Sequence, residues 1–321
     1  MMTILFMFNL YLGWVLIHMS YSKLKYALVG FICSFILIQS QIAATVKVVA
    51  ITQEFASIAA DIGGEYVKTT TLIKGSRNLH NINPKPSMVM KVKDADMIIR
   101  LGMKQDSWID GLITVAKNNR IFPGKKGYVD ASARIDKLEV PEGNLDGSMG
   151  DVHIEGNPHY WLNPTNGIII AAQIRDHLIQ IDPNNSQAYS ANYQRFETAI
   201  TQKYEDWKQQ LTPLKKRIFV AYHKVWPYFF EAFGLTSIGE LEPLPGIPPT
   251  TKQLLKLKQT VAEYNQSPLI ITANYYPKKV GDRFAKMVSG KHVVLYPSVD
   301  GVKSHTYTEL FDVMVKELTT H

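Results

Sequence analysis

The sequence predicts an α/β protein made of two lobes, each with a parallel sheet, joined by one long rigid helix. Short apolar runs alternate with amphipathic segments in both halves of the chain, which is typical of parallel strands covered by helices. Residues 186–211 keep a helical pattern without a break, and 26 such residues would span about 39 Å. A helix of this length exceeds the usual size inside one compact domain, so we expect it to cross from one lobe to the other.

The amino-terminal segment is typical of a secretory signal peptide. Lys23 and Lys25 precede an apolar stretch of about a dozen residues, which ends in small residues at Ala44. Cleavage there would leave Thr45 as the first mature residue. The earlier apolar stretch has two interpretations. Either Met19 is the true start and the residues before it are a wrongly assigned extension, or the stretch is a first membrane segment followed by an anchor.

Composition excludes several classes of function. The net charge is +7, but the basic residues are scattered rather than gathered in a stripe, so we do not expect nucleic-acid binding. The single cysteine, Cys33, lies in the expected signal peptide. The mature chain would then have no disulfide and no thiolate metal ligand, which fits a bacterial periplasm.

The elements can be expected in order along the chain. The first lobe should hold strands at 46–52, 66–75 and 95–102 and helices at 54–64, 86–93, 107–119 and 165–181. The second should hold strands at 217–223, 268–276 and 291–297 and helices at 224–235, 278–289 and 306–318. Residues 236–265 read as a Pro-rich loop that leads into an amphipathic helix. The expected division is 1–44 for the signal peptide, 45–185 for the first lobe, 186–212 for the linking helix and 213–321 for the second lobe.

Three of the nine histidines, His80, His159 and His223, each follow a strand or a rigid turn. Neutral imidazole is a common ligand for zinc, and a rigid loop holds a ligand at the required distance and angle. A lone histidine in a loop is more often a hydrogen-bonded or surface residue, and these three are too far apart for a finger motif. The residues alone therefore leave both interpretations open. We expect His153 to be a solvated loop residue, with a role as accessory ligand as the alternative.

The segments around these histidines resemble a known family. "HNINPKPS" with its trailing "ADMIIRLGMKQDSWID", "GNPHYWLNP" and "VAYHKVWPYFFEAFGL" are similar, in the same order, to three signatures of the metal-binding solute-binding proteins of ABC transporters. The resemblance covers nearly the whole expected mature chain.

The resemblance implies that the metal lies in the cleft between the lobes. His80 and His159 would come from the first lobe and His223 from the second. A histidine at the third position implies Zn²⁺ as the transported ion, with Mn²⁺ as the alternative, and nitrogen ligands agree with zinc. It also implies a monomeric periplasmic protein that delivers the ion to a membrane permease, without catalysis.

The fourth ligand departs from the family pattern. The family's aspartate position holds Tyr296, Pro297 or Ser298, and Asp300 is the nearest carboxylate. Asp300 is the expected ligand, with Glu240 or water as alternatives.

Three other functions remain open at this stage. A zinc hydrolase would use the same ligands with Glu240 as general base, although no His-Glu-x-x-His motif is present. An adhesin-like surface protein is also compatible with the resemblance. A carboxylate as fourth ligand would favour Mn²⁺ or Fe²⁺.

Overall fold

Two four-stranded sheets form the framework of the computed structural model, which describes residues 45–75, 77–79, 82–141, 153–242 and 246–320. The predicted signal peptide, with Cys33, lies outside these residues. The described chain from Thr45 onward belongs to one compact unit that contains both sheets. None of its helices is long and apolar enough to cross a membrane.

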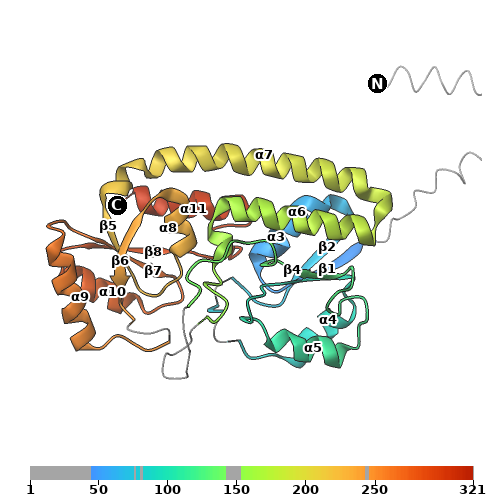
Figure 1. Cartoon of the computed structure of the whole chain (residues 1–321), viewed down its shortest axis with the longest axis horizontal. Helices are drawn as coiled ribbons and strands as arrows, with labels where there is room; N and C mark the ends of the chain where they lie inside the picture. Colours follow the sequence, from blue (N-terminus) through green and yellow to red (C-terminus); the bar gives the residue numbers. More distant parts are fainter. Residues whose placement is uncertain (1–44, 76, 80–81, 142–152, 243–245, 321) are drawn as a thin grey trace, which may run out of the picture. The chain divides into compact units, whose positions relative to one another are not determined.

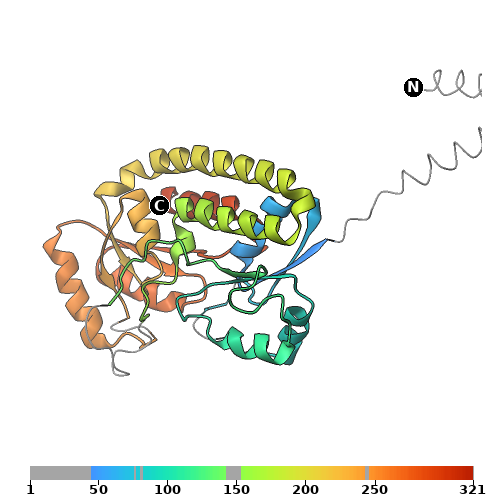
Figure 2. The ribbon, with the colours of Figure 1, turned by 45° about the vertical axis from the view of Figure 1, so that its right-hand side comes forward.

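The first lobe is built on the sheet β2-β1-β3-β4, in which all pairs are parallel. Its strands are β1 (Val46–Ala50), β2 (Val67–Thr71), β3 (Met97–Arg100) and β4 (Tyr128–Asp130). Its helices are α3 (Gln53–Gly63), α4 (Pro86–Lys93), α5 (Trp108–Ala116) and α6 (Pro164–Ile181), with short 3-10 turns at Gly64–Tyr66 and Tyr160–Leu162. Figures 1 and 2 show α3 and α6 on one side of the sheet and α4 and α5 on the other.

The second lobe repeats this plan with the parallel sheet β6-β5-β7-β8. Its strands are β5 (Ile218–Ala221), β6 (Thr236–Glu240), β7 (Leu269–Ala273) and β8 (Lys291–Leu295). Its helices are α8 (Pro227–Phe233), α9 (Thr251–Glu263), α10 (Lys278–Met287) and α11 (Tyr307–Thr319). The predicted pair of α/β lobes with parallel sheets is therefore confirmed.

The predicted linking helix is α7 (Ser186–Leu211), which has 26 residues. It packs against α3 and α6 of the first lobe and against α11 of the second. Figure 1 shows α6 and α11 next to it. Two 3-10 turns, Pro183–Asn185 and Thr212–Lys216, flank it. The helix therefore contacts both lobes.

Two strands were missed by the sequence prediction. Residues 236–240 were expected in a Pro-rich loop, but they form β6, and β4 was not predicted at all. Both lie at the edge of a sheet, and four of the five β6 residues are half-buried. Edge strands are held by backbone pairing and need no apolar run, so the hydrophobic pattern did not reveal them.

Side chains from one lobe bond to the backbone of the other close to His159. Trp161 Nε1 donates to the carbonyl of Pro297 at 2.8 Å, and the hydroxyl of Tyr307 donates to the carbonyl of Trp161 at 2.6 Å. A Cβ on Gly167 would lie 2.3 Å from the Tyr307 ring, so only glycine allows this approach of α11 to α6. These contacts place the segment that follows His159 against both lobes.

Candidate metal site

His159 lies at the start of the 3-10 turn Tyr160–Leu162, directly after Pro158, and is 2% exposed. Its backbone N–H donates to Oδ1 of Asn157 at 3.0 Å, and its Nδ1 lies 3.1 Å from the same oxygen. Because an amide oxygen can only accept, Nδ1 carries the proton, and in the neutral ring Nε2 then carries the lone pair. The contact with Asn157 thus holds the ring in the form in which Nε2, the nitrogen that would bind a metal, is unprotonated.

His223 follows β5 by two residues, at the carboxyl end of the sheet, and is 4% exposed. Its Nδ1 lies 2.8 Å from Oε2 of Glu242, whose side chain is 7% exposed. A carboxylate partner at Nδ1 is the usual arrangement behind a metal-ligating histidine, because it fixes the ring and increases the basicity of Nε2.

The rings of His159 and His223 lie next to each other although they come from different lobes. Their centroids are 6.1 Å apart, with 76° between the ring planes. Two imidazoles on one tetrahedral zinc ion, with Zn–N bonds of about 2.0–2.1 Å, would have centroids about 5 Å apart. The two rings would therefore have to approach each other by only about 1 Å to bind the same ion.

Three further rings surround this pair. His153 lies 6.3 Å from His159, Trp161 lies 5.4 Å from His159, and Tyr276 lies 5.8 Å from His223. Burial raises the pKa of Tyr276 well above its ordinary value, so this phenol stays neutral. His153, which was expected in a solvated loop, is half-buried beside His159, and its role as an accessory ligand stays a hypothesis.

His80 falls outside the described residues, so its position relative to His159 and His223 stays a prediction. Its neighbour Leu79 is partly buried against the core of the first lobe. Within the described part of the chain, no three His, Cys, Asp or Glu side chains gather closely enough to hold a metal ion. The role of His80 as a ligand beside His159 and His223 stays a prediction.

The side chain of Asp300 forms hydrogen bonds within a turn after β8. Its Oδ1 accepts from the backbone N–H groups of Val302 at 2.8 Å, Lys303 at 2.7 Å and Ser304 at 3.2 Å. All three donors bond to the same carboxylate oxygen, and this carboxylate holds the turn. The role of Asp300 as fourth ligand stays a prediction.

Glu240 is the last residue of β6, and Glu242 follows it by two residues. Burial raises the pKa of Glu240, while the charges of Lys224 and His223 oppose that shift. The residue in contact with His223 is Glu242, which the sequence analysis did not single out. Parallel pairing of β5 with β6 brings it there, and recognising β6 as a strand would have indicated it.

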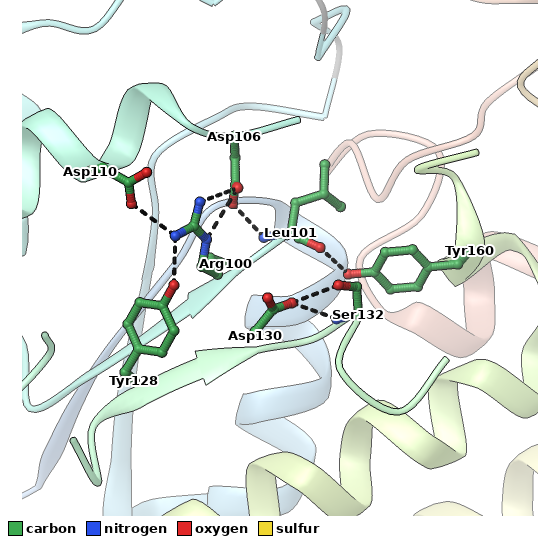
Figure 3. Close-up of polar contacts among 8 residues, drawn as sticks. All are labelled: Arg100, Leu101, Asp106, Asp110, Tyr128, Asp130, Ser132 and Tyr160. Carbon is green, nitrogen blue, oxygen red and sulfur yellow. Dashed lines mark hydrogen bonds and ion pairs between the residues drawn. The ribbon is translucent and has the colours of Figure 1, made fainter. Parts of the chain in front are cut away.

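A buried polar network at the carboxyl end of β3 and β4 supports the His159 segment (Figure 3). The hydroxyl of Tyr160 donates to the carbonyl of Leu101 at 2.6 Å. The N–H of Leu101 donates to Oδ2 of Asp106 at 2.6 Å, and Oδ1 of Asp106 accepts from two nitrogens of Arg100 at 2.8 and 3.2 Å. The residue next to His159 is therefore bonded to a loop that an ion pair holds in place.

The comparison with family models identifies the chain. Residues 48–321 match the model described as "ZnuA: Zinc-uptake complex component A periplasmic". The chain belongs to this family. The expected resemblance to metal-binding solute-binding proteins of ABC transporters is thereby confirmed.

Relatives of this zinc-uptake family include proteins named for either metal. The high-affinity zinc uptake system protein ZnuA of Yersinia pestis is 25% identical over 271 residues, which cover 81% of this chain and 85% of the relative. The manganese ABC transporter substrate-binding lipoprotein PsaA of Streptococcus mitis is 29% identical over 224 residues, covering 67% and 69%.

A crystal structure of ZnuA has the same fold, with a TM-score of 0.71 and 21% identity over 86% of this chain and 98% of that one. A Mn-bound periplasmic metal-binding protein from Candidatus Liberibacter asiaticus also scores 0.71, at 20% identity over 86% and 99%. These two likenesses support the fold and leave the metal open.

Proposed function

We propose that this protein captures a divalent metal ion, Zn²⁺ by preference, in the periplasm and delivers it to the membrane permease of an ABC importer. The ion is cargo, and no chemical step is catalysed. Its ligands are His80, His159 and His223, with Asp300 in the fourth position. One chain supplies all four, so we infer that the protein works as a monomer. Because its basic residues are scattered rather than gathered in a stripe, we expect no nucleic-acid partner.

One observation carries this proposal. Two buried imidazoles from different lobes face each other, and each has an acceptor at Nδ1, Asn157 for His159 and Glu242 for His223. Because Nδ1 of each ring is engaged in this way, Nε2 is the nitrogen through which each histidine would bind an ion that joins the lobes. Membership of the zinc-uptake family and the expected signal peptide support transport from the periplasm.

The donor atoms favour zinc over manganese. Relatives named for zinc and for manganese match the chain at similar identity, so overall similarity does not choose between the metals. Imidazole nitrogen suits Zn²⁺, whereas Mn²⁺ prefers carboxylate and other oxygen ligands. With three imidazoles and one oxygen, we expect zinc to bind more tightly than manganese.

Calorimetric titration of Zn²⁺ and Mn²⁺ into the metal-free protein tests the proposal. His80→Ala, His159→Ala and His223→Ala should each weaken zinc binding. Each loss should exceed about 10–100-fold, which is the cost of losing a hydrogen-bond partner behind a metal ligand. His177→Ala is the matched control, because His177 lies on α6 and its Nδ1 contacts the carbonyl of Lys126. Wild-type zinc affinity in all three site variants would refute the site.

Asp300→Asn isolates the fourth ligand. Asparagine keeps an oxygen for the three N–H groups of the turn and removes the negative charge. If Asp300 binds the ion, zinc affinity falls while the thermal stability of the metal-free protein stays the same. Unchanged zinc affinity would assign the fourth position to another oxygen.

A further inference from the structure

The side chain of Asn157 forms hydrogen bonds with three residues near the two histidines, namely His159, Glu139 and Lys224. It is 2% exposed. Its Oδ1 accepts from the backbone N–H of His159 at 3.0 Å and faces Nδ1 of the same residue at 3.1 Å. Its Nδ2 donates to Oε2 of Glu139 at 3.0 Å and to the carbonyl of Lys224 at 2.8 Å. Every hydrogen-bonding group of this amide is therefore occupied.

These partners allow only one orientation of the amide. Rotated by 180°, its NH₂ group would face the N–H donor of His159, and its oxygen would face the carbonyl of Lys224 and the carboxylate of Glu139. Both contacts would be repulsive, and a buried amide without partners is unfavourable. The oxygen consequently points at Nδ1 of His159, and that nitrogen must carry the proton.

The same amide reaches the second histidine through the backbone. Lys224 follows His223 directly, so its carbonyl moves with the loop that carries His223. A second link runs in parallel, because Nζ of Lys224 donates to Oε1 of Glu139 at 2.8 Å. Asn157 thus contacts the ring of one histidine and the chain beside the other, across the two lobes.

We propose that Asn157 is a positioning residue with two roles. It selects the tautomer of His159 that leaves Nε2 unprotonated, and it fixes the separation between His159 and His223. It does not touch the ion. The second role rests on the proposed function, whereas the first can be measured without any metal.

Two substitutions separate the two roles. Asn157→Ala removes both the acceptor and the donors. Asn157→Asp keeps an oxygen for the N–H and Nδ1–H of His159, but it places a second acceptor against the carbonyl of Lys224 and the carboxylate of Glu139. Asn118→Ala is the matched control, because Asn118 is 6% exposed and its Nδ2 donates to the carbonyls of Val92 at 3.0 Å and Ala95 at 2.7 Å, within the first lobe.

The first measurement is the tautomer of His159 in the metal-free, full-length protein, read from the ¹⁵N and ¹³C shifts of its imidazole. Wild type, Asn157→Asp and Asn118→Ala should keep the proton on Nδ1. Asn157→Ala should move part or all of it to Nε2. Asn118→Ala also loses buried hydrogen bonds. If Asn157 had only a structural role, Asn157→Ala would therefore behave like Asn118→Ala, and the tautomer of His159 would not change.

The second measurement is zinc affinity by calorimetry. Both Asn157 variants should bind zinc about 10–100-fold more weakly than wild type, the range found when an outer partner of a metal ligand is lost. Asn118→Ala should bind as wild type does. If Asn157→Ala does not fold, Asn157→Asp still tests the separation role, since it should retain the tautomer and lose affinity.

Three results would decide the matter. Retention of the Nδ1–H tautomer in folded Asn157→Ala would overturn the first role, and wild-type zinc affinity in Asn157→Asp would overturn the second. A wild-type protein that binds no zinc would refute the proposed function and the second role, while a tautomer shift in Asn157→Ala would still support the first.

Discussion

The guanidinium of Arg100 forms two ion pairs of equal length, and we expect only one of them to matter for stability. It lies 2.8 Å from Asp106 and 2.8 Å from Asp110. The side chains of Arg100 and Asp106 are 9% and 2% exposed, whereas that of Asp110 is 55% exposed. An exposed pair contributes about 0.2–1 kcal/mol. Removal of one partner from a buried pair costs about 3–5 kcal/mol, because the remaining charge is left without compensation.

Arg100→Met should therefore lower the free energy of unfolding by about 3–5 kcal/mol. It also removes the donor to the hydroxyl of Tyr128 at 2.6 Å. With about 2–4 °C of melting temperature per kcal/mol in domains of 150–250 residues, the midpoint should fall by about 6 °C or more. Asp110→Asn, the control, should change stability by about 1 kcal/mol or less. Urea unfolding followed by circular dichroism measures both.

The pH dependence provides a second check. Burial raises the pKa of Asp106, and the charge of Arg100 opposes that shift. Without Arg100 the folded-state pKa rises further above the unfolded value, so the folded variant favours a protonated carboxyl. Stability linked to this group is then present below the unfolded pKa and is lost as the pH rises through the folded pKa. The deficit of Arg100→Met should be larger at pH 7.5 than at pH 4.5.

A cost below about 1 kcal/mol for Arg100→Met would refute this reasoning. So would a deficit that is independent of pH, or an equal loss in Asp110→Asn. Because the Asp106 loop also bonds to Tyr160 through Leu101, Arg100→Met should reduce zinc affinity as well, whereas Asp110→Asn should not.

Three further substitutions follow from buried contacts. Burial raises the pKa of Glu54, whose Oε1 accepts from the N–H of Val299, so Glu54→Gln should raise the melting temperature at pH 7.5, with a gain that disappears as the pH falls below the unfolded pKa. Tyr307→Phe leaves the buried carbonyl of Trp161 without this donor and should cost about 1–3 kcal/mol in urea unfolding. Glu242→Ala should weaken zinc binding by about 10–100-fold in calorimetry, with Glu242→Gln retaining part of the affinity because it keeps an acceptor for Nδ1.

Elements with a strong local signal could be predicted from the sequence. The long helix α7 and helix α4 begin and end at the expected residues, because nothing breaks the first and Pro86 starts the second. Asn163 caps α6, with its Oδ1 accepting from the N–H of Thr165. The edge strands β4 and β6 have no apolar run, and their existence depends on partners far away in the sequence.

The candidate site could be predicted only in part, for a similar reason. The loops that hold His159 and His223 have a visible pattern of strand or turn, histidine and following proline. The acceptors behind these rings do not. Asn157 is set by the turn before Pro158, and Glu242 is set by the register of β6 on β5. Sequence spacing carries no information about which polar side chain a parallel register places behind a given ring.

The docking of α11 has a consequence for the order in which the protein can fold. The backbone N–H of Tyr307 donates to Oγ of Ser57 at 2.9 Å, and Phe311 stacks on Trp207 of α7 with ring centroids 5.0 Å apart. During translation, residue 57 is synthesised long before residue 307. A nascent chain therefore cannot bury this face of α3 until almost the last residues have emerged, and truncation before α11 should leave both lobes with exposed aromatic surface.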